Sequence, residues 1–269
     1  MTEPIPSSMG TGIALNHPVP PLNQELSDRL RAAGLDPAAI TALAVAGLDE
    51  DLAGGVDVTT AATVPSDARG RAEVVARAAG VVAGLPVAET VFWLASADGR
   101  VDYAPHASDG DRVTAGQTVL TVTGPIAGLL TAERTALNLL CHLSGVATLT
   151  RQWADAIAGT RARIRDTRKT TLGLRALEKY AVRCGGGVNH RMALSDAALV
   201  KDNHVAAAGS VSAAFNAVRS TAPGLPLEIE CDTLEQVAEA LAAGADLILL
   251  DNFTVADMAA AVDLADGRA

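Results

Sequence analysis

The chain has 269 residues, with 21 lysines and arginines against 31 aspartates and glutamates, and its formal net charge is −10. Hydrophobic residues make up 49% of it, which excludes a disordered chain and allows one large or two modest domains. The acidic balance argues against a nucleic-acid-binding protein, and no run of about 18 uncharged apolar residues predicts a membrane span. The three cysteines are odd in number and far apart, and no basic segment followed by an apolar one opens the chain. We therefore expect a cytoplasmic, reduced protein without disulfides, a zinc site or a secretory signal.

The first part of the chain predicts a lead-in and a small domain of helices and strands. Residues 1–22 hold five of the twelve prolines and are expected to be disordered. Asp36 and Pro37 predict the start of a helix, residues 70–78 alternate as in a strand, and residues 85–97 are helical in pattern. Residues 110–122 predict a hairpin about a glycine turn. Such hairpins also occur in swinging-arm carrier domains, but no lysine precedes Lys169, which excludes that function.

From Thr131 onward the pattern changes to an alternation of strands and helices. A long helix over residues 131–158 comes first. The expected strands are 163–165, 198–201, 227–230 and 247–250, and the expected helices are 174–184, 210–221, 233–243 and 254–264. Alternation of this kind predicts a parallel sheet or barrel, in which active sites lie at the carboxyl ends of the strands.

Ionisable residues follow all four of the expected strands. The segments at the strand ends are Asp166–Lys169, Lys201–His204, Glu228–Asp232 and Asp251–Asn252. Packing alone does not require charged side chains at the end of every strand. We therefore predict a functional site at this edge of the sheet.

The basic residues are concentrated around that edge. Residues 161–201 contain ten arginines and lysines against three acidic residues, although the chain as a whole is acidic. A basic pocket in an acidic protein indicates a small polyanionic ligand, since arginine binds carboxylate or phosphate through paired hydrogen bonds and lysine acts as a point charge. Arg175, Lys179 and Arg183 stand at helical spacing with Glu178 and are interpreted as a solvated helix face.

Two further features are assigned to the same site. Arg134 is expected in the first turn of the helix that opens at Thr131, where a cation is unfavourable unless an anion shares the position or an acidic neighbour pairs with it. The three glycines of residues 185–187 would let the chain turn sharply before His190 and Arg191, which predicts a loop that faces a ligand.

Carboxylates form the opposite pole of the predicted site. Glu228 and Glu230 are expected on one face of their strand, and Asp251 ends the next strand. They could be ion-pair partners of the cations, or they could hold Mg²⁺ together with phosphate oxygens of a substrate. For Glu230 and Asp251 we favour the second role.

Several of these segments together resemble the quinolinate phosphoribosyltransferase family, also called carboxylating nicotinate-nucleotide pyrophosphorylases. The resemblance extends from about Leu48 to the end of the chain. The segments that carry it are Thr131–Asn138, Arg165–Thr170, Gly185–Arg191, Val200–His204, Glu228–Glu230 and Leu249–Phe253.

The resemblance implies a fold, a reaction and an assembly. The fold is an N-terminal α/β sandwich over residues 23–130 followed by an incomplete parallel α/β barrel over residues 131–269, with the last barrel strands expected to be missing. The reaction joins quinolinate to 5-phosphoribosyl 1-diphosphate in the presence of Mg²⁺ and yields nicotinate mononucleotide, CO₂ and diphosphate in NAD synthesis. The assembly is a homodimer with shared active sites, with higher oligomers left open.

The resemblance also implies roles for individual residues. Arg134 would reach the neighbouring subunit's site, Lys169 would meet 5-phosphoribosyl 1-diphosphate, and Glu230 and Asp251 would face the ribose and Mg²⁺. Lys169, Glu230 and Asp251 are thereby the expected catalytic residues. The expected substrate-binding residues are Arg134, Thr167, Arg168, Lys169, His190, Arg191, Lys201, Glu230 and Asp251, of which Arg168, His190, Arg191 and Lys201 would hold the quinolinate carboxylates.

Three alternatives stay open on the sequence. A related enzyme of the same fold could act on another base or pyridine acid. An aldolase-like barrel could use Lys169 or Lys201 as a Schiff-base nucleophile. A non-catalytic sensor could bind phosphoribosyl compounds without turning them over.

Overall fold

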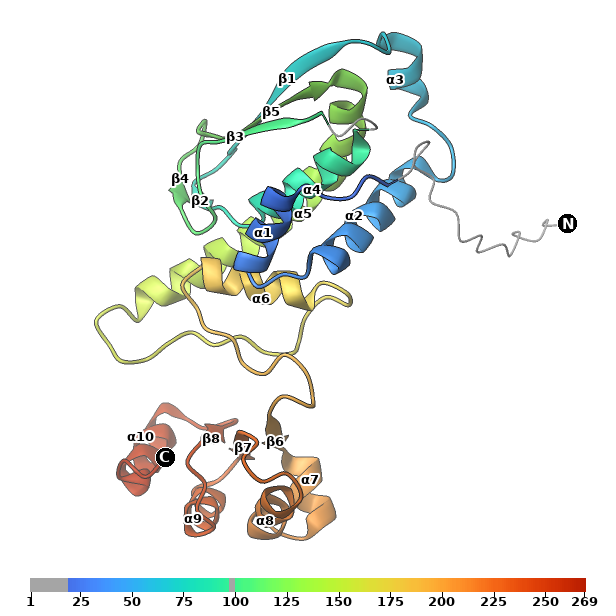
Figure 1. Cartoon of the computed structure of the whole chain (residues 1–269). Coiled ribbons are helices and arrows are strands. Elements are labelled where there is room, and N and C mark those ends of the chain that lie inside the picture. The colour runs from blue at the N-terminus through green and yellow to red at the C-terminus, as the bar shows by residue number, and fades with distance from the viewer. Residues whose placement is uncertain (1–18, 97–99) are drawn as a thin grey trace, which may run out of the picture. The chain divides into compact units, whose positions relative to one another are not determined.

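The computed structural model describes residues 19–96 and 100–269, and the chain divides into two compact units, Met1–His190 and Arg191–Ala269 (Figure 1). Most of the predicted disordered lead-in lies outside the described residues. The α/β class predicted from the sequence is confirmed, since each unit combines a sheet with helices.

The first unit opens with three helices whose starts follow from local capping. Helix α1 spans Gln24–Ala32, α2 spans Pro37–Leu52 and α3 spans Val58–Thr63. The side chain of Asp36 accepts a hydrogen bond from the backbone N–H of Ala38 at 3.1 Å, and Pro37 occupies the first helical position. This is the predicted start of α2, in which an acidic cap and a proline satisfy the free end of the helix.

A three-stranded antiparallel sheet covers the long helices of this unit. Its strands β1 (Arg69–Val75), β5 (Thr118–Pro125) and β3 (Asp102–Pro105) lie in the order β1-β5-β3. Helices α4 (Leu85–Ala95) and α5 (Ile126–Ala156) pack beneath it in Figure 1. Their shared core contains Phe92, Leu94, Leu120 and Leu129.

The predicted hairpin over residues 110–122 is wrong. Both of its strands exist, but β4 (Arg112–Val113) pairs with β2 (Gly80–Val81), whereas β5 pairs with β1 and β3. The turn between β4 and β5 is present, with Gly116 at φ +86°. This turn connects two different sheets. The sequence did not reveal this, because alternation within a segment indicates which face each side chain occupies but not which strand is the partner.

Helix α5 begins at Ile126, five residues before the predicted start at Thr131, and continues for 31 residues. It contacts α4, α2, β2 and α6 (Arg175–Cys184) and therefore forms the centre of the first unit. The domain boundary predicted between residues 130 and 131 falls within α5, and it stays a prediction.

The second unit has the predicted strand and helix alternation. Strands β6 (Ala198–Val200), β7 (Leu227–Cys231) and β8 (Ile248–Leu250) form a parallel sheet in the order β6-β7-β8. Its helices are α7 (Asp202–Ala208), α8 (Val211–Thr221), α9 (Leu234–Ala242) and α10 (Val255–Ala265). Ser210, Thr233 and Thr254 cap the last three, so their predicted starts are confirmed to within one residue. The short helix α7 was not predicted.

The three parallel strands do not close into a barrel within the described residues. Residues Phe215, Ile229 and Val237 join the sheet to α8 and α9 in one buried core. No single helix of the described chain is both long and apolar enough to cross a membrane, although the bent pair α1 and α2 meets that test by length and composition.

Candidate active site

The first strand-end segment lies beside the segment that carries His190. Residues 163–165 were predicted as a strand, but that prediction is wrong, because they form only an isolated parallel bridge between Arg165 and Val188. The N–H of Val188 donates to the carbonyl of Ile164 at 2.8 Å, and the N–H of Asp166 donates to the carbonyl of Val188 at 3.1 Å. The two segments leave the bridge in the same direction, so the residues after Asp166 and those after Val188 meet at one edge.

Thr167, Arg168 and Lys169 form a tight turn at that edge. The hydroxyl oxygen of Thr167 accepts a hydrogen bond from the N–H of Lys169 at 3.0 Å, and both residues are exposed. Arg168 is half-buried, and its Nε is enclosed without a hydrogen-bond partner in the described part of the chain. An enclosed guanidinium donor without a partner is suited to binding an anion.

Behind this turn lies a buried ion pair that sequence reasoning missed. Lys179 on α6 pairs with Asp166, and their side chains are 1% and 7% exposed. The interpretation of Lys179 as part of a solvated helix face is therefore wrong. Helical spacing showed which residues share a stripe of α6, but not that the carboxylate of Asp166 packs against that stripe.

Of the three consecutive glycines, only one takes a left-handed backbone conformation that favours glycine. Gly186 has φ +88°, whereas Gly185 ends α6 in a right-handed conformation. A Cβ built on Gly185 would lie 2.5 Å from the carbonyl oxygen of Ala147 in α5. The glycine segment therefore serves close packing of α6 against α5 as well as the turn that leads to His190.

Arg134 is not in the first turn of a helix, so the argument from the helix dipole fails for it. Because α5 begins at Ile126, Arg134 lies more than two turns into the helix. Its side chain is exposed and makes no hydrogen bond or ion pair within residues 19–96 and 100–269. The structure does not bring Arg134 to the strand-end turn of its own unit.

The second unit places Lys201, Glu230 and Asp251 at the carboxyl edge of its parallel sheet. Lys201 follows β6, and its Nζ lies 2.9 Å from Oε2 of Glu230 in β7. The Glu230 side chain is 8% exposed and that of Lys201 is 44% exposed. Of the two roles considered for Glu230, the ion-pair role is confirmed, and the metal role stays a prediction.

Asp251 lies at the end of the neighbouring strand. Register pairs Glu230 with Leu249, and Asp251 follows two residues later, so its side chain is on the same face of the sheet as Glu230. Asp251 is exposed, and the next residue, Asn252, takes the left-handed conformation at φ 58°. The sheet thus presents one buried, paired carboxylate and one exposed carboxylate at the same edge.

Arg191 opens the second unit on the approach to β6. Its Nη1 donates to the carbonyl of Ala197 at 2.9 Å, and its Nε is buried with no partner among the described residues. Arg191 and His204 also line a cavity of about 530 Å³ beside β6 and α8. Among the described residues, an enclosed Nε without a partner thus occurs at Arg191 in the second unit and at Arg151 and Arg168 in the first.

No group of three or more histidine, cysteine or acidic side chains in the described residues could hold a metal ion by itself. Glu230 and Asp251 are oxygen donors of the kind that Mg²⁺ prefers, and Mg²⁺ is commonly held by one or two carboxylates together with phosphate oxygens. The donor set fits an ion that arrives with a phosphorylated substrate.

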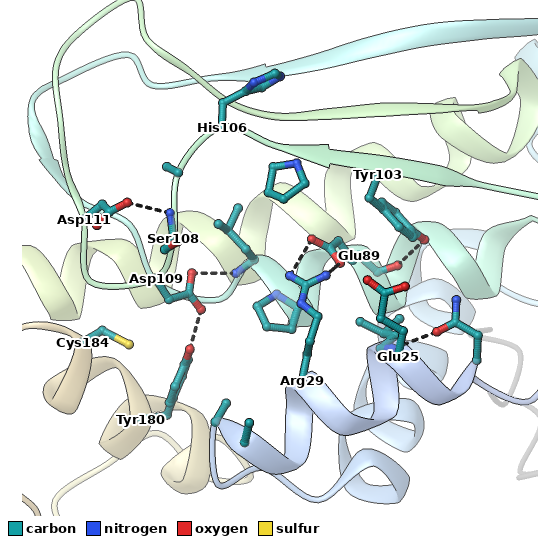
Figure 2. A pocket seen from close by; sticks show the side chains of 18 of the residues that line it. Glu25, Arg29, Glu89, Tyr103, His106, Ser108, Asp109, Asp111, Tyr180 and Cys184 are labelled. Carbon is teal, nitrogen blue, oxygen red and sulfur yellow. Dashed lines mark hydrogen bonds and ion pairs between the residues drawn. The ribbon is translucent and has the colours of Figure 1, made fainter.

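A separate cavity of about 1060 Å³ lies in the first unit, lined by α1, the start of α4, the loop after β3 and the end of α6. Figure 2 shows Arg29 joined to Glu89 and Tyr180 joined to Asp109. The bond from Nη2 of Arg29 to Oε1 of Glu89 is 3.0 Å long. Burial raises the pKa of Glu89, an effect that Arg29 only partly offsets. This cavity contains none of the predicted site residues.

A carboxyl edge of parallel strands that carries lysine and carboxylate side chains is typical of an α/β enzyme that acts on a small charged substrate. Comparison with protein-family models identifies the particular family. The model described as "Quinolinate phosphoribosyl transferase, N-terminal domain" matches residues 57–144, and the model of the C-terminal domain of the same family matches residues 146–269. The chain belongs to the quinolinate phosphoribosyl transferase family.

Individual relatives agree with this assignment. The nicotinate-nucleotide pyrophosphorylase (carboxylating) of Mycobacterium leprae is 56% identical over 224 residues, which are 82% of this chain and 78% of that protein. The probable enzyme of the same name from Synechocystis is 49% identical over 197 residues, which cover 73% of this chain and 66% of that protein. The crystal structure of NadC from Streptococcus pyogenes matches with a TM-score of 0.82 and 43% identity, over 87% of this chain and 82% of that one.

Proposed function

We propose that this chain transfers the phosphoribosyl group of 5-phosphoribosyl 1-diphosphate to quinolinate, with loss of CO₂, to give nicotinate mononucleotide and diphosphate in NAD synthesis. The observation that carries the proposal is the match of both family domains to residues 57–144 and 146–269, together with the cations at the strand ends. The relatives from Mycobacterium leprae and Synechocystis bear the name of this activity.

The residue chemistry suits two anionic substrates. Arg168 and Arg191 each have an Nε without a partner among the described residues, so their guanidinium groups keep hydrogen-bonding capacity for a carboxylate. In the proposed roles Arg168, His190, Arg191 and Lys201 bind the carboxylates of quinolinate, Thr167 contributes to the same site, and Lys169 meets the phosphoribosyl substrate. Charge-assisted hydrogen bonds contribute about 1.5–3 kcal/mol each, so several are needed to offset the desolvation of a dianion.

Transfer breaks the bond between the ribose C1 and the diphosphate and forms a bond from C1 to the pyridine nitrogen of quinolinate. Positive charge develops on the ribose as diphosphate leaves with the electron pair. Fixed carboxylates at Glu230 and Asp251 stabilise that charge more in the transition state than in the ground state. The bond to the carboxylate beside the ring nitrogen then breaks, CO₂ leaves, and a proton takes its place on the ring carbon.

Mg²⁺ is part of the proposal as a partner of the phosphoribosyl substrate. When bound, it supplies positive charge that neutralises diphosphate oxygens. Glu230 and Asp251 would hold it together with those oxygens. The 2.9 Å bond to Lys201 keeps Glu230 oriented.

We also propose a cytoplasmic homodimer with shared active sites, in which Arg134 of one subunit serves the site of the other. The side chain of Arg134 is exposed and has no hydrogen-bond or ion-pair partner among the described residues of its own chain, which supports this role. Cys141, Cys184 and Cys231 are free thiols, which fits a reducing compartment.

The primary test measures diphosphate and CO₂ release from 5-phosphoribosyl 1-diphosphate and Mg²⁺, with quinolinate or nicotinate as acceptor. Turnover with quinolinate alone supports the proposal. Arg168→Gln should lose most of it, whereas the matched control Arg112→Gln should keep it, because Arg112 makes an exposed ion pair with Asp155 elsewhere in the first unit. Binding of both substrates without release of diphosphate would favour a non-catalytic sensor of phosphoribosyl compounds. Turnover of another pyridine acid in place of quinolinate would favour a related enzyme of the same fold.

Shared sites have a separate test. Inactive Arg134→Ala and inactive Lys169→Ala proteins are mixed under conditions that exchange subunits. Mixed dimers should regain part of the activity, because one of their two sites carries both wild-type residues. Verified mixed dimers that stay inactive would contradict the role of Arg134.

A further inference from the structure

Lys179 is a buried lysine that the proposed chemistry does not use. It lies on α6 with its side chain 1% exposed, and it is the largest of the fully buried side chains. Lysine is almost never fully buried unless it is paired, because removing an ammonium from water is costly. A packing role alone would be filled better by leucine or methionine.

The partner of Lys179 is the carboxylate on which both site segments converge. Oδ1 of Asp166 accepts hydrogen bonds from Nζ of Lys179 and from the backbone N–H of His190, the latter at 2.7 Å. Oδ2 accepts from Nδ2 of Asn189 at 2.5 Å, and the same amide nitrogen donates to the carbonyl of Lys179 at 2.8 Å. These bonds form a closed ring of side-chain and main-chain groups.

The ring connects directly to the residues proposed to bind quinolinate. Asp166 immediately precedes Thr167 and Arg168, and its carboxylate holds the backbone of His190. Lys179 neutralises that carboxylate from the side of α6. The relative position of Arg168 and His190 therefore depends on this charge-balanced ring as well as on the backbone bridge between Arg165 and Val188.

Helix α6 is itself fixed on its other side, so it provides a rigid support for Lys179. The hydroxyl of Tyr180 donates to Oδ2 of Asp109 at 2.5 Å (Figure 2). The carboxylate of Asp109 also accepts the N–H groups of Gly84 and Leu85 at 2.9 and 3.0 Å, at the start of α4.

We propose that Lys179 is a positioning residue for quinolinate: its ammonium holds Asp166, and through Asp166 it sets Arg168 and His190 at the spacing that the dianion requires. The inference rests on the proposed function. Without the ammonium, Asp166 is a buried carboxylate without its counter-charge. A buried carboxylate that has lost its counter-charge is unfavourable, so the Asp166 side chain should turn away from this position and its bond to the N–H of His190 should weaken.

The test uses Lys179→Ala with chemical rescue. Propylammonium replaces the three carbons and the ammonium that alanine lacks, and propan-1-ol occupies similar space without the charge. We expect the KM for quinolinate to rise at least tenfold in the variant, with a smaller change in kcat. Propylammonium should recover most of that KM, and propan-1-ol should not.

Arg29→Met is the matched control. It also removes the cation of an ion pair with a buried carboxylate in the first unit, since Glu89 is 0% exposed and Arg29 is 34% exposed, but that pair lines the separate cavity. It should be less stable to urea than the wild type while its KM for quinolinate stays within twofold. Lys179→Met, which retains the volume of the side chain, should behave as Lys179→Ala does without rescue.

Three results would overturn the proposal. They are an unchanged KM for quinolinate in Lys179→Ala, equal rescue by propylammonium and propan-1-ol, and a failure of both Lys179 variants to fold even with propylammonium present. The last two would make Lys179 a purely structural residue. Wild-type turnover of quinolinate is measured in the same series, so a failure of this inference is distinguished from a failure of the proposed function.

Discussion

Gly185, the C-cap of α6, packs closely against α5, so its replacement tests the packing behind the site. A Cβ at this position would lie 2.5 Å from the carbonyl oxygen of Ala147 and 2.5 Å from Cβ of Thr150. The oxygen belongs to the backbone of a 31-residue helix and cannot move without displacing that helix. Gly185→Ala should therefore destabilise the first unit by about 1–3 kcal/mol, the usual cost of overpacking a well-packed interior.

Gly145→Ala is the matched control for this substitution. Gly145 also lies in α5, but a Cβ there meets nothing within 4 Å. Alanine in a helix is favoured over glycine by roughly 0.5–1 kcal/mol, so this variant should be more stable than the wild type. The two substitutions add the same methyl group and should have opposite effects.

Urea unfolding followed by tryptophan fluorescence measures the effect in the right part of the molecule. Both tryptophans, Trp93 and Trp153, belong to the unit Met1–His190, so the signal reports that unit alone. The KM for quinolinate should also rise in Gly185→Ala, because the chain continues from Gly185 to His190. An unfolding midpoint equal to that of the wild type would refute the reasoning about the contact.

Three further outcomes are expected. Leu143→Ala, at a fully buried position, should reduce the free energy of unfolding by about 2–5 kcal/mol in the same urea assay. Burial tends to raise the pKa of Glu178, but hydrogen bonds, including one with His142, outweigh burial and lower that pKa. The ionised Glu178 therefore stabilises the folded protein above about pH 4.3, and this contribution is lost as the pH falls through the lower native pKa. Glu178→Gln should accordingly make the free energy of unfolding depend less on pH in this acid range. Burial raises the pKa of the Cys184 and Cys231 thiols to about 11, so few of these groups are thiolates at pH 8. In a variant with Cys141→Ser, a thiol reagent at pH 8 should therefore react at an appreciable rate only after unfolding.

The parts of the fold that depend on neighbouring residues could be predicted from the sequence. Asp36 and Pro37 begin α2 as expected, and Ser210, Thr233 and Thr254 cap the helices that follow them. The parallel strands β6, β7 and β8 were also predicted, because short apolar runs between capped helices leave a clear pattern. The charged residues at the ends of these strands were recognised for the same reason.

The parts that depend on contacts distant in the sequence could not be predicted. The pairing of β4 with β2 joins segments that alternation alone cannot match. Lys179 is thirteen residues from Asp166, and its burial follows from the crossing of α6 over the strand-end segment rather than from its own helical stripe. The start of α5 was placed late because Pro125, the last residue of β5, is also the N-cap of the helix and provides no side-chain cap.

The distribution of lysine has a practical consequence for labelling and immobilisation. The chain contains three lysines, and Lys179 is closed to solvent. Lys169 is exposed and the Lys201 side chain is 44% exposed, so amine-directed reagents have these two side chains and the α-amino group to react with. Coupling the protein to a surface or a dye through lysine would therefore modify the residues proposed to meet the substrates, whereas a thiol-directed tag at the exposed Cys141 would leave both of them intact.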